Sequence, residues 1–265
     1  MKFIKNFPDS WDLMWNKKIL LIMLFDFFFF FFLFLIGGIA MQNLLNNMES
    51  LQEKGEILNL QELENTQEST AFFLSYLNEL QGIISNIFWI IGLFIGSIFL
   101  LWCIFHGLNW MLTDNIINKN KINFKKFLKL NGISLIWFLV IIIFLKIFNQ
   151  GLVEGLTTQE KTGTGIILII FFLIIYYFLS INYSLFLLKE NFKKSIKEVF
   201  NLGVIKFYRV IPVFFLILLI FLLLAVIFYF LNNIFWGFSI IGLIAFLLLI
   251  SWSRIFILLN LKEFY

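Results

Sequence analysis

The sequence has little of what most enzyme active sites are built from. Its 265 residues include one cysteine, Cys103, and one histidine, His106, so it can form neither an internal disulfide nor a zinc site of ordinary ligand spacing. It also lacks a phosphate-binding glycine-rich loop, an H-E-x-x-H motif and a G-x-S-x-G nucleophile motif. These absences weigh against an enzyme, and we expect no cofactor and no metal.

Charged residues and prolines are scarce as well. Charged side chains make up 14% of the chain and there are two prolines, whereas 61% of the residues are hydrophobic and the mean hydropathy is +0.95. A soluble domain of this length could not keep so much apolar surface from water, because about half of an ordinary globular chain is apolar. The apolar runs are continuous, which favours helices over the alternating strands of a membrane barrel. The sequence therefore predicts an all-α, polytopic membrane helical bundle that forms one integral membrane domain over residues 1–265.

Six stretches are apolar and long enough to be predicted as transmembrane helices. A bilayer core of about 30 Å requires about 20 apolar residues in a helix. The predicted spans are residues 19–41, 83–112, 133–148, 165–188, 210–231 and 234–261. Only Asn232 and Asn233 separate the last two spans, which predicts a tight helical hairpin.

Positive charge is distributed unevenly over the connections between these spans. Seventeen of the 20 Lys and Arg residues fall on one side, and only Lys54, Lys146 and Lys161 fall on the other. Positively charged loops stay in the cytoplasm, so we expect a multi-pass protein of the cell membrane with both termini cytoplasmic. The exterior then carries the acidic loop 42–82, interpreted as two short amphipathic helices joined by a polar stretch around Asn65 to Thr70. It is either a solvated connection or a cap that attracts cations or a basic partner.

Each odd-numbered span follows an amphipathic segment that contains an Asn-Phe pair. The segments start near Asn6, Asn123 and Asn191, and the last two share the sequence Asn-Phe-Lys-Lys. Asparagine is a good N-cap, so we expect short interfacial helices whose apolar residues face the acyl chains. Their lysines would contact anionic headgroups, and the candidates are Lys17, Lys18, Lys125, Lys126, Lys193, Lys194 and Lys197. The segments and their hairpins either form a threefold repeat or share only the composition of basic inward-facing loops.

This layout of basic amphipathic helix, long span, short exterior connection and second span resembles the membrane domains attached to some glycerophosphodiester phosphodiesterases. It is also similar to several uncharacterised six-span prokaryotic membrane protein families. The resemblance is carried by Asn123 to Lys126 with the span after them, and by Asn191 to Arg209 with Pro212 beyond. No catalytic residue transfers, because the phosphodiesterase domain is absent from the sequence. The resemblance implies a membrane-embedded module.

Four polar residues inside the spans are the candidates for a functional site: Asp26, His106, Asn182 and Arg254. Each lies seven or eight residues from a polar residue at the cytoplasmic boundary, which places all four about 10–12 Å deep. An ionisable group in hydrocarbon costs about 3 kcal/mol, so it usually faces the bundle interior or snorkels to the interface. A buried cluster with Asp26 paired to Arg254 could serve as a proton relay, an ion site or a lipid-headgroup site. The structural alternative is that Arg254 snorkels, Asp26 fixes helix packing and His106 is simply packed.

Three functions are compatible with these features. The favoured one is a non-catalytic integral membrane protein that organises lipid or assists other membrane proteins as a scaffold. The alternatives are a small transporter or channel that uses the polar cluster, and an intramembrane enzyme. Spans three and five are almost wholly apolar near the midplane, which disfavours a continuous polar path. The expected partners are membrane lipids and other membrane proteins rather than nucleic acid, because the basic residues lie between long apolar runs.

Overall fold

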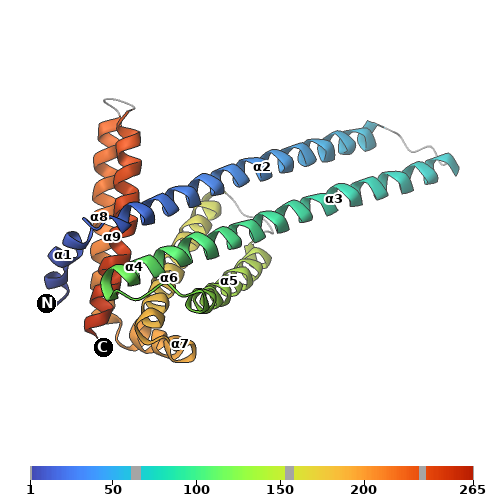
Figure 1. Ribbon diagram of the computed structural model, residues 1–265. Coiled ribbons are helices and arrows are strands. Elements are labelled where there is room, and N and C mark those ends of the chain that lie inside the picture. Colours follow the sequence, from blue (N-terminus) through green and yellow to red (C-terminus); the bar gives the residue numbers. More distant parts are fainter. Residues whose placement is uncertain (1, 61–66, 153–157, 233–236, 265) are drawn as a thin grey trace. The chain divides into compact units, whose positions relative to one another are not determined.

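The computed structural model describes residues 2–60, 67–152, 158–232 and 237–264, and its regular secondary structure is helical throughout these ranges (Figure 1). Six of the described helices are long and apolar enough to cross a membrane: Lys18–Lys54, Ser75–Asn118, Phe124–Phe148, Gly165–Lys189, Phe207–Asn232 and Phe238–Glu263. Each predicted span overlaps one of them. The prediction of an all-α polytopic membrane protein with six spans is therefore confirmed.

The chain divides into two compact units. Unit 1 comprises Met1–Phe27 and Cys103–Tyr265, and unit 2 comprises Phe28–Trp102. The elements, in chain order, are α1 (Lys2–Leu13), α2 (Lys18–Leu60), α3 (Gln67–Leu101), the π-helix η1 (Trp102–His106), α4 (Gly107–Asn118), α5 (Phe124–Leu152), α6 (Thr158–Lys189), α7 (Phe192–Phe200), the π-helix η2 (Asn201–Ile205), α8 (Phe207–Asn232) and α9 (Phe238–Glu263). Of the two residues predicted to separate the last two spans, Asn232 is the last residue of α8, and Asn233 lies outside the described residues.

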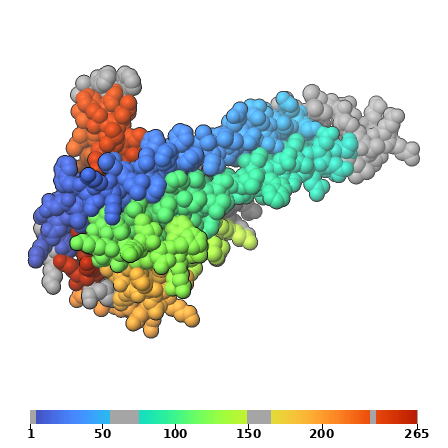
Figure 2. All heavy atoms as spheres, in the orientation of Figure 1, coloured from blue at the N-terminus to red at the C-terminus, as the bar shows by residue number. Residues whose placement is uncertain are grey.

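The acidic loop 42–82 is not built from separate short helices. In unit 2, α2 continues without a break from the first span to Leu60, and α3 runs from Gln67 into the second span (Figure 1). The coloured parts of the two helices lie side by side in Figure 2. Lys54 forms an ion pair with Glu79, and the Tyr76 hydroxyl donates to the Lys54 carbonyl oxygen at 3.1 Å. Both spans therefore extend beyond the length that a bilayer requires and pair there. Residues 61–66, which include the start of the predicted polar stretch, lie outside the described residues.

The three Asn-Phe segments do not share one local structure. The segments at Asn6 and Asn191 form the separate helices α1 and α7, as predicted, whereas α5 runs unbroken from Phe124 and leaves no separate helix there. Asn191 caps α7 by accepting from the Lys194 amide at 3.1 Å, and Asn123 accepts from the Lys125 amide at 2.9 Å. Asn6 lies inside α1 instead. The local pattern needed for a threefold repeat is thus incomplete at the first and second segments.

Helix α1 is fixed against α9 by polar and aromatic contacts. The Asn6 amide donates to Asn260 Oδ1 at 3.3 Å, and the Trp252 indole N–H donates to Ser10 Oγ at 2.9 Å. The Trp11 ring stacks on Trp252 with centroids 5.5 Å apart. The chain's first helix is therefore part of the core of unit 1 rather than a free interfacial helix.

The core of unit 1 is centred on the C-terminal half of α9. This helix contacts α1, α4, α6 and α8, and residues 251–258 are all buried. The large side chains that are fully buried include Trp110, Tyr183, Phe186, Trp252 and Phe256. Large apolar side chains along α5, α6 and α8 are exposed, as expected for helices that face lipid. The polar residues predicted inside the spans lie at the level of this core.

Candidate functional site

The centre of the candidate site is an ion pair between Asp26 on α2 and Arg254 on α9. Arg254 Nη1 donates to Asp26 Oδ2 at 2.9 Å and Nη2 donates to Asp26 Oδ1 at 2.6 Å. Asn109 on α4 adds a third donor, with Nδ2 at 2.7 Å from Asp26 Oδ1. Asp26 and Arg254 are 4% and 3% exposed, and Asn109 is fully buried. The structure thus brings together two of the four predicted site residues and adds Asn109.

The π-helix η1 determines how α4 faces this pair. A π-helical turn contains more residues than an α-helical turn, so it rotates everything that follows it about the helix axis. Directly after η1, all six residues from Asn109 to Asp114 are buried in unit 1. The Thr113 hydroxyl donates to the Asn109 carbonyl oxygen at 2.8 Å, so its hydrogen is already satisfied within α4. The bulge therefore allows α4 to present polar side chains to several neighbouring helices.

His106 lies in an aromatic group beside the ion pair. Its Nε2 accepts a hydrogen bond of 2.9 Å from the Trp110 indole N–H, and its ring centroid lies 5.4 Å from that of Tyr183. The Tyr183 hydroxyl in turn shares a hydrogen bond with Ser134 on α5. An indole N–H can only donate, so a proton reaches Nε2 only after the Trp110 contact breaks. In this geometry His106 Nε2 is an acceptor for as long as the Trp110 contact lasts.

Asn182 on α6 is buried apart from these contacts. It is 2% exposed, and its Oδ1 has no hydrogen-bond partner among the described residues. The Asn109 Oδ1 and the Ser184 Oγ are also buried and have no hydrogen-bond partner among the described residues. Buried polar atoms are usually satisfied by protein or ordered water, so these three atoms mark places where water can complete the network. Asn182 is therefore buried, but it makes no described hydrogen bond to the Asp26–Arg254 pair.

A second buried ion pair, not predicted as a site, joins α4 to α5. Lys126 Nζ lies 2.8 Å from Asp114 Oδ2 and 3.0 Å from Glu190 Oε1, and it donates to the Leu187 carbonyl oxygen at 3.5 Å. Lys126 is 8% exposed and Asp114 is 2% exposed. Glu190, just after α6, takes a left-handed conformation with φ 54°. That conformation is rare outside glycine, which indicates that the surrounding contacts hold the turn in place.

Asparagines extend this second network across the ends of further helices. The Asn118 amide donates to Asp114 Oδ1 at 2.8 Å, and the Asn120 amide donates to both carboxylate oxygens at 3.2–3.3 Å. Lys262 on α9 donates to Asn118 Oδ1 at 2.8 Å, and Lys18 on α2 donates to Asn115 Oδ1. Asp114 thereby links α4 directly to α5 and, through its neighbours, to the ends of α2 and α9.

The lysines predicted at lipid headgroups divide into two groups. Lys126 is not at the surface: it is buried between Asp114 and the Leu187 carbonyl oxygen, where its charge is already paired. The other six are exposed, and they are Lys17, Lys18, Lys125, Lys193, Lys194 and Lys197. Consecutive lysines on a helix point about 100° apart, so one member of the pair Lys125–Lys126 can face inward while the other faces out.

None of the known proteins compared with this chain matches it. This holds for protein-family models, for curated proteins and for solved structures. The resemblance to the membrane domains of glycerophosphodiester phosphodiesterases therefore stays a prediction that nothing here tests. The functional conclusion has to come from the geometry of the site.

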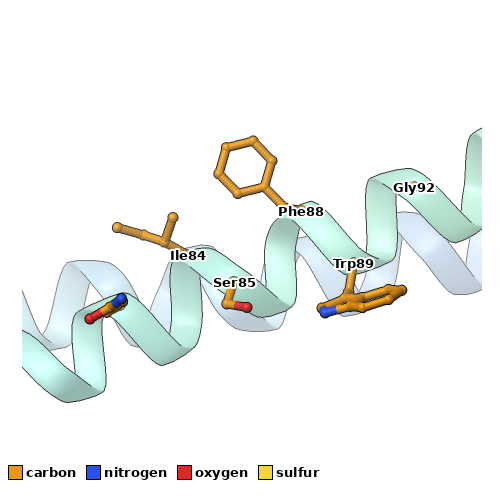
Figure 3. Close-up of a pocket in the computed structure, with 6 residues that line it drawn as sticks. Ile84, Ser85, Phe88, Trp89 and Gly92 are labelled. Atoms are coloured by element: carbon orange, nitrogen blue, oxygen red, sulfur yellow. The ribbon is translucent and has the colours of Figure 1, made fainter.

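The described polar contacts join helices that are distant in the sequence. Within the described part of the chain, no group of three or more His, Cys, Asp or Glu side chains could hold a metal ion. Two grooves on the helix surfaces are mainly apolar and contain no residue of the polar cluster. One lies on α3 beside Ser85 and Trp89 (Figure 3), and the other lies between α8 and α9. The Asp26 carboxylate accepts from three donors, which occupy three of its about four acceptor positions.

Proposed function

We propose that this chain is a non-catalytic membrane scaffold that organises lipid or assists other membrane proteins, and that its polar cluster is a structural clamp. The observation that carries the proposal is the closed ion pair, in which both Asp26 oxygens accept from Arg254 and one also accepts from Asn109. An intramembrane carboxylate that moves protons or ions has to change partners during the cycle. A carboxylate that accepts from a guanidinium through both oxygens is better suited to hold the two helices together.

Two further features support a scaffold. His106 is held by the Trp110 indole N–H, which removes the second titratable group from a relay. Six of the seven lysines predicted at headgroups are exposed, where anionic headgroups would meet them. In this proposal the protein lies in the cell membrane with both termini in the cytoplasm, and its partners are membrane lipids and other membrane proteins.

A transporter is the second candidate, and one observation favours it. The buried Oδ1 atoms of Asn109 and Asn182 and the Ser184 hydroxyl have no described partner, so water inside the bundle would have polar groups to bind. A continuous row of such waters would make a path for protons or ions. The two candidates therefore differ in whether the buried level is reached from the aqueous phase.

Thiol labelling separates them. In a Cys103→Ser background, a cysteine at Asn182 reports access to the buried level, and a cysteine at the exposed Lys121 serves as the matched control. The scaffold predicts that a small water-soluble methanethiosulfonate reagent labels Lys121→Cys rapidly and Asn182→Cys at least about a hundredfold more slowly in proteoliposomes. Equal labelling rates, together with a proton or ion flux that Asp26→Asn abolishes, would replace the scaffold with the transporter.

Orientation is tested by the same chemistry in cells. A cysteine at Ser50, in the acidic part of α2, should react with an impermeant reagent from outside, whereas Lys121→Cys should react only after lysis. The opposite pattern would place both termini outside and reject the cytoplasmic assignment of the basic segments.

A further inference from the structure

The segment from α7 to the start of α8 has one face fixed on the protein. Ser195 and Val199 on α7 and Leu202 on η2 are buried, and α6 contacts both elements. At Gly203 the backbone presses against α6, because a Cβ there would lie 2.6 Å from the Phe178 ring. The Tyr177 hydroxyl also donates to the Gly203 carbonyl oxygen at 3.2 Å. The segment therefore packs on α6 with one face, and its outer side chains point away from α6.

The outer face changes from cationic to apolar between Lys193 on α7 and Ile205 on η2. Lys193, Lys197, Phe200 and Val204 follow one another at intervals of four, three and four residues, and all four are exposed. Val204 and Ile205 are 55% and 70% exposed. Lysines thus occupy the exposed face of α7, and the exposed apolar side chains of Val204 and Ile205 follow on η2, just before Lys206 and Arg209.

The net charge of residues 192–209 is strongly positive. The cations of this segment are Lys193, Lys194, Lys197, Lys206 and Arg209. Glu198 is its one acidic residue in the sequence, and it forms an ion pair with Lys189 at the end of α6. The Arg209 guanidinium lies over the Tyr208 ring, 5.7 Å from its centroid, next to further exposed aromatic surface at Phe207. The exposed surface is accordingly both cationic and apolar.

We propose that residues 192–209 form a wedge that inserts its η2 end beneath the headgroups of an anionic lipid leaflet, while the lysines of α7 contact the phosphates. The inference rests on the proposed function and assigns it a place on the molecule. Chain connectivity favours lipid over water or a soluble partner, because Val204 and Ile205 lie only two or three residues before the membrane-spanning helix α8. At about 1.5 Å per helical residue, they are within about 5 Å of the start of that span.

The chemistry of the face also fits a leaflet better than an acidic protein. An interfacial amphipathic helix buries its apolar residues about 5–10 Å into the boundary between headgroups and acyl chains, with lysines on its polar side. Phe200, Val204 and Ile205 would fill that depth, and the i, i+4 pair Lys193–Lys197 would lie at the phosphates. Insertion of a fixed wedge displaces headgroups in one leaflet only, which would make this surface sensitive to lipid packing.

The depth of Val204 tests the insertion. In the Cys103→Ser background, a cysteine at Val204 is labelled with an environment-sensitive fluorophore in nanodiscs that contain phosphatidylglycerol, and Lys121→Cys is the matched control. We expect nitroxide lipids to quench the Val204 probe at least about fivefold more than the Lys121 probe, with iodide showing the reverse order. If iodide quenches the Val204 probe as strongly as the Lys121 probe, the wedge is overturned. This includes the case in which an acidic protein, added afterwards, then protects the Val204 probe from iodide.

The role of the lysines is tested by lipid preference. One lysine near an anionic surface contributes about a fivefold change in binding. The preference is measured as energy transfer from the Val204 probe to an acceptor-labelled phosphatidylglycerol, relative to the phosphatidylcholine analogue. The variant Lys193→Gln/Lys197→Gln should therefore lower this preference by up to about 25-fold. The control variant Lys121→Gln should leave it unchanged. An unchanged preference would overturn headgroup recognition. Neither outcome alters the labelling of Asn182→Cys, so failure of the wedge and failure of the scaffold are distinguishable.

Discussion

The Asp26–Arg254 pair allows the sharpest test of the clamp, a double-mutant cycle. Asp26→Asn keeps the shape of the side chain but removes the charge that two guanidinium nitrogens contact at 2.6 and 2.9 Å. Arg254→Leu removes the cation and leaves the buried carboxylate with the Asn109 amide as its described partner. Each single change therefore leaves one charge buried and poorly compensated.

The structure indicates the size of the effect. Removing one partner of a buried ion pair costs about 3–5 kcal/mol, because the remaining charge is left without compensation. The double variant has neither charge of the pair, and the amide oxygen introduced at position 26 can still accept from Asn109, so we expect a total loss of about 1–3 kcal/mol. The coupling energy is then about 3 kcal/mol or more. This exceeds the average of about 0.6 kcal/mol for hydrogen bonds between membrane helices, because both partners here are charged.

The assay is the free energy of unfolding of the purified protein in mixed micelles, with the wild type, both single variants and the double variant measured together. The control is Ser50→Ala. Ser50 belongs to unit 2, whereas Asp26 and Arg254 belong to unit 1, so this change should alter the free energy of unfolding by less than about 0.5 kcal/mol. If the stability losses of the two single variants sum to the loss of the double variant within about 0.5 kcal/mol, Asp26 and Arg254 act independently. The clamp would then be refuted.

Three further changes are tested by the same unfolding measurement. Lys126→Met should cost about 3–5 kcal/mol because it leaves the buried Asp114 carboxylate without its cation, and a loss below about 1 kcal/mol would show that the pair is solvated. Gly203→Ala should cost about 1–3 kcal/mol because the added Cβ would lie 2.6 Å from the Phe178 ring, and a neutral result would show that η2 does not rest on α6. Lys119→Gly should stabilise by about 1 kcal/mol because residue 119 has a φ of 57°, and a loss of stability would show that its side chain contributes more than the strain costs.

The number and type of the elements could be predicted because long apolar runs leave few alternatives. A run that must cross about 30 Å of hydrocarbon has to satisfy its backbone internally, so it is helical whatever its neighbours do. Helix ends are less determined. The sequence 42–60 is polar enough to suggest a separate element, yet α2 extends to Leu60 because helical propagation continues when no proline or cap interrupts it. For the same reason α5 begins at Phe124 and absorbs its amphipathic segment.

The pairing of Asp26 with Arg254 could also be predicted, whereas the contacts of Asn109 and Lys126 could not. Counting about 1.5 Å per residue brought Asp26 and Arg254 to one level, and an opposite pair at one level has a reason to meet. Rotation about each helix axis was not available from the sequence. A π-helix has no reliable sequence signal, so the rotation that turns Asn109 and Asp114 inward was missed. Asp114 looked like a boundary residue, because nothing in the sequence places Lys126 opposite it.

Helix α4 explains why these networks occur together. It is 12 residues long and contributes Asn109 to the Asp26–Arg254 pair and Asp114 to the Lys126 pair. In hydrocarbon an apolar helix gains little by leaving lipid for protein, because lipid tails are as apolar as leucine, so specific polar contacts have to fix which helices meet. Two such contacts five residues apart attach α4 to α2 and α9 at one level and to α5 at the next. A chain whose spans otherwise offer continuous apolar surface can use these contacts to define a single arrangement of its core, while most of its helical surface stays available to lipid and to other membrane proteins.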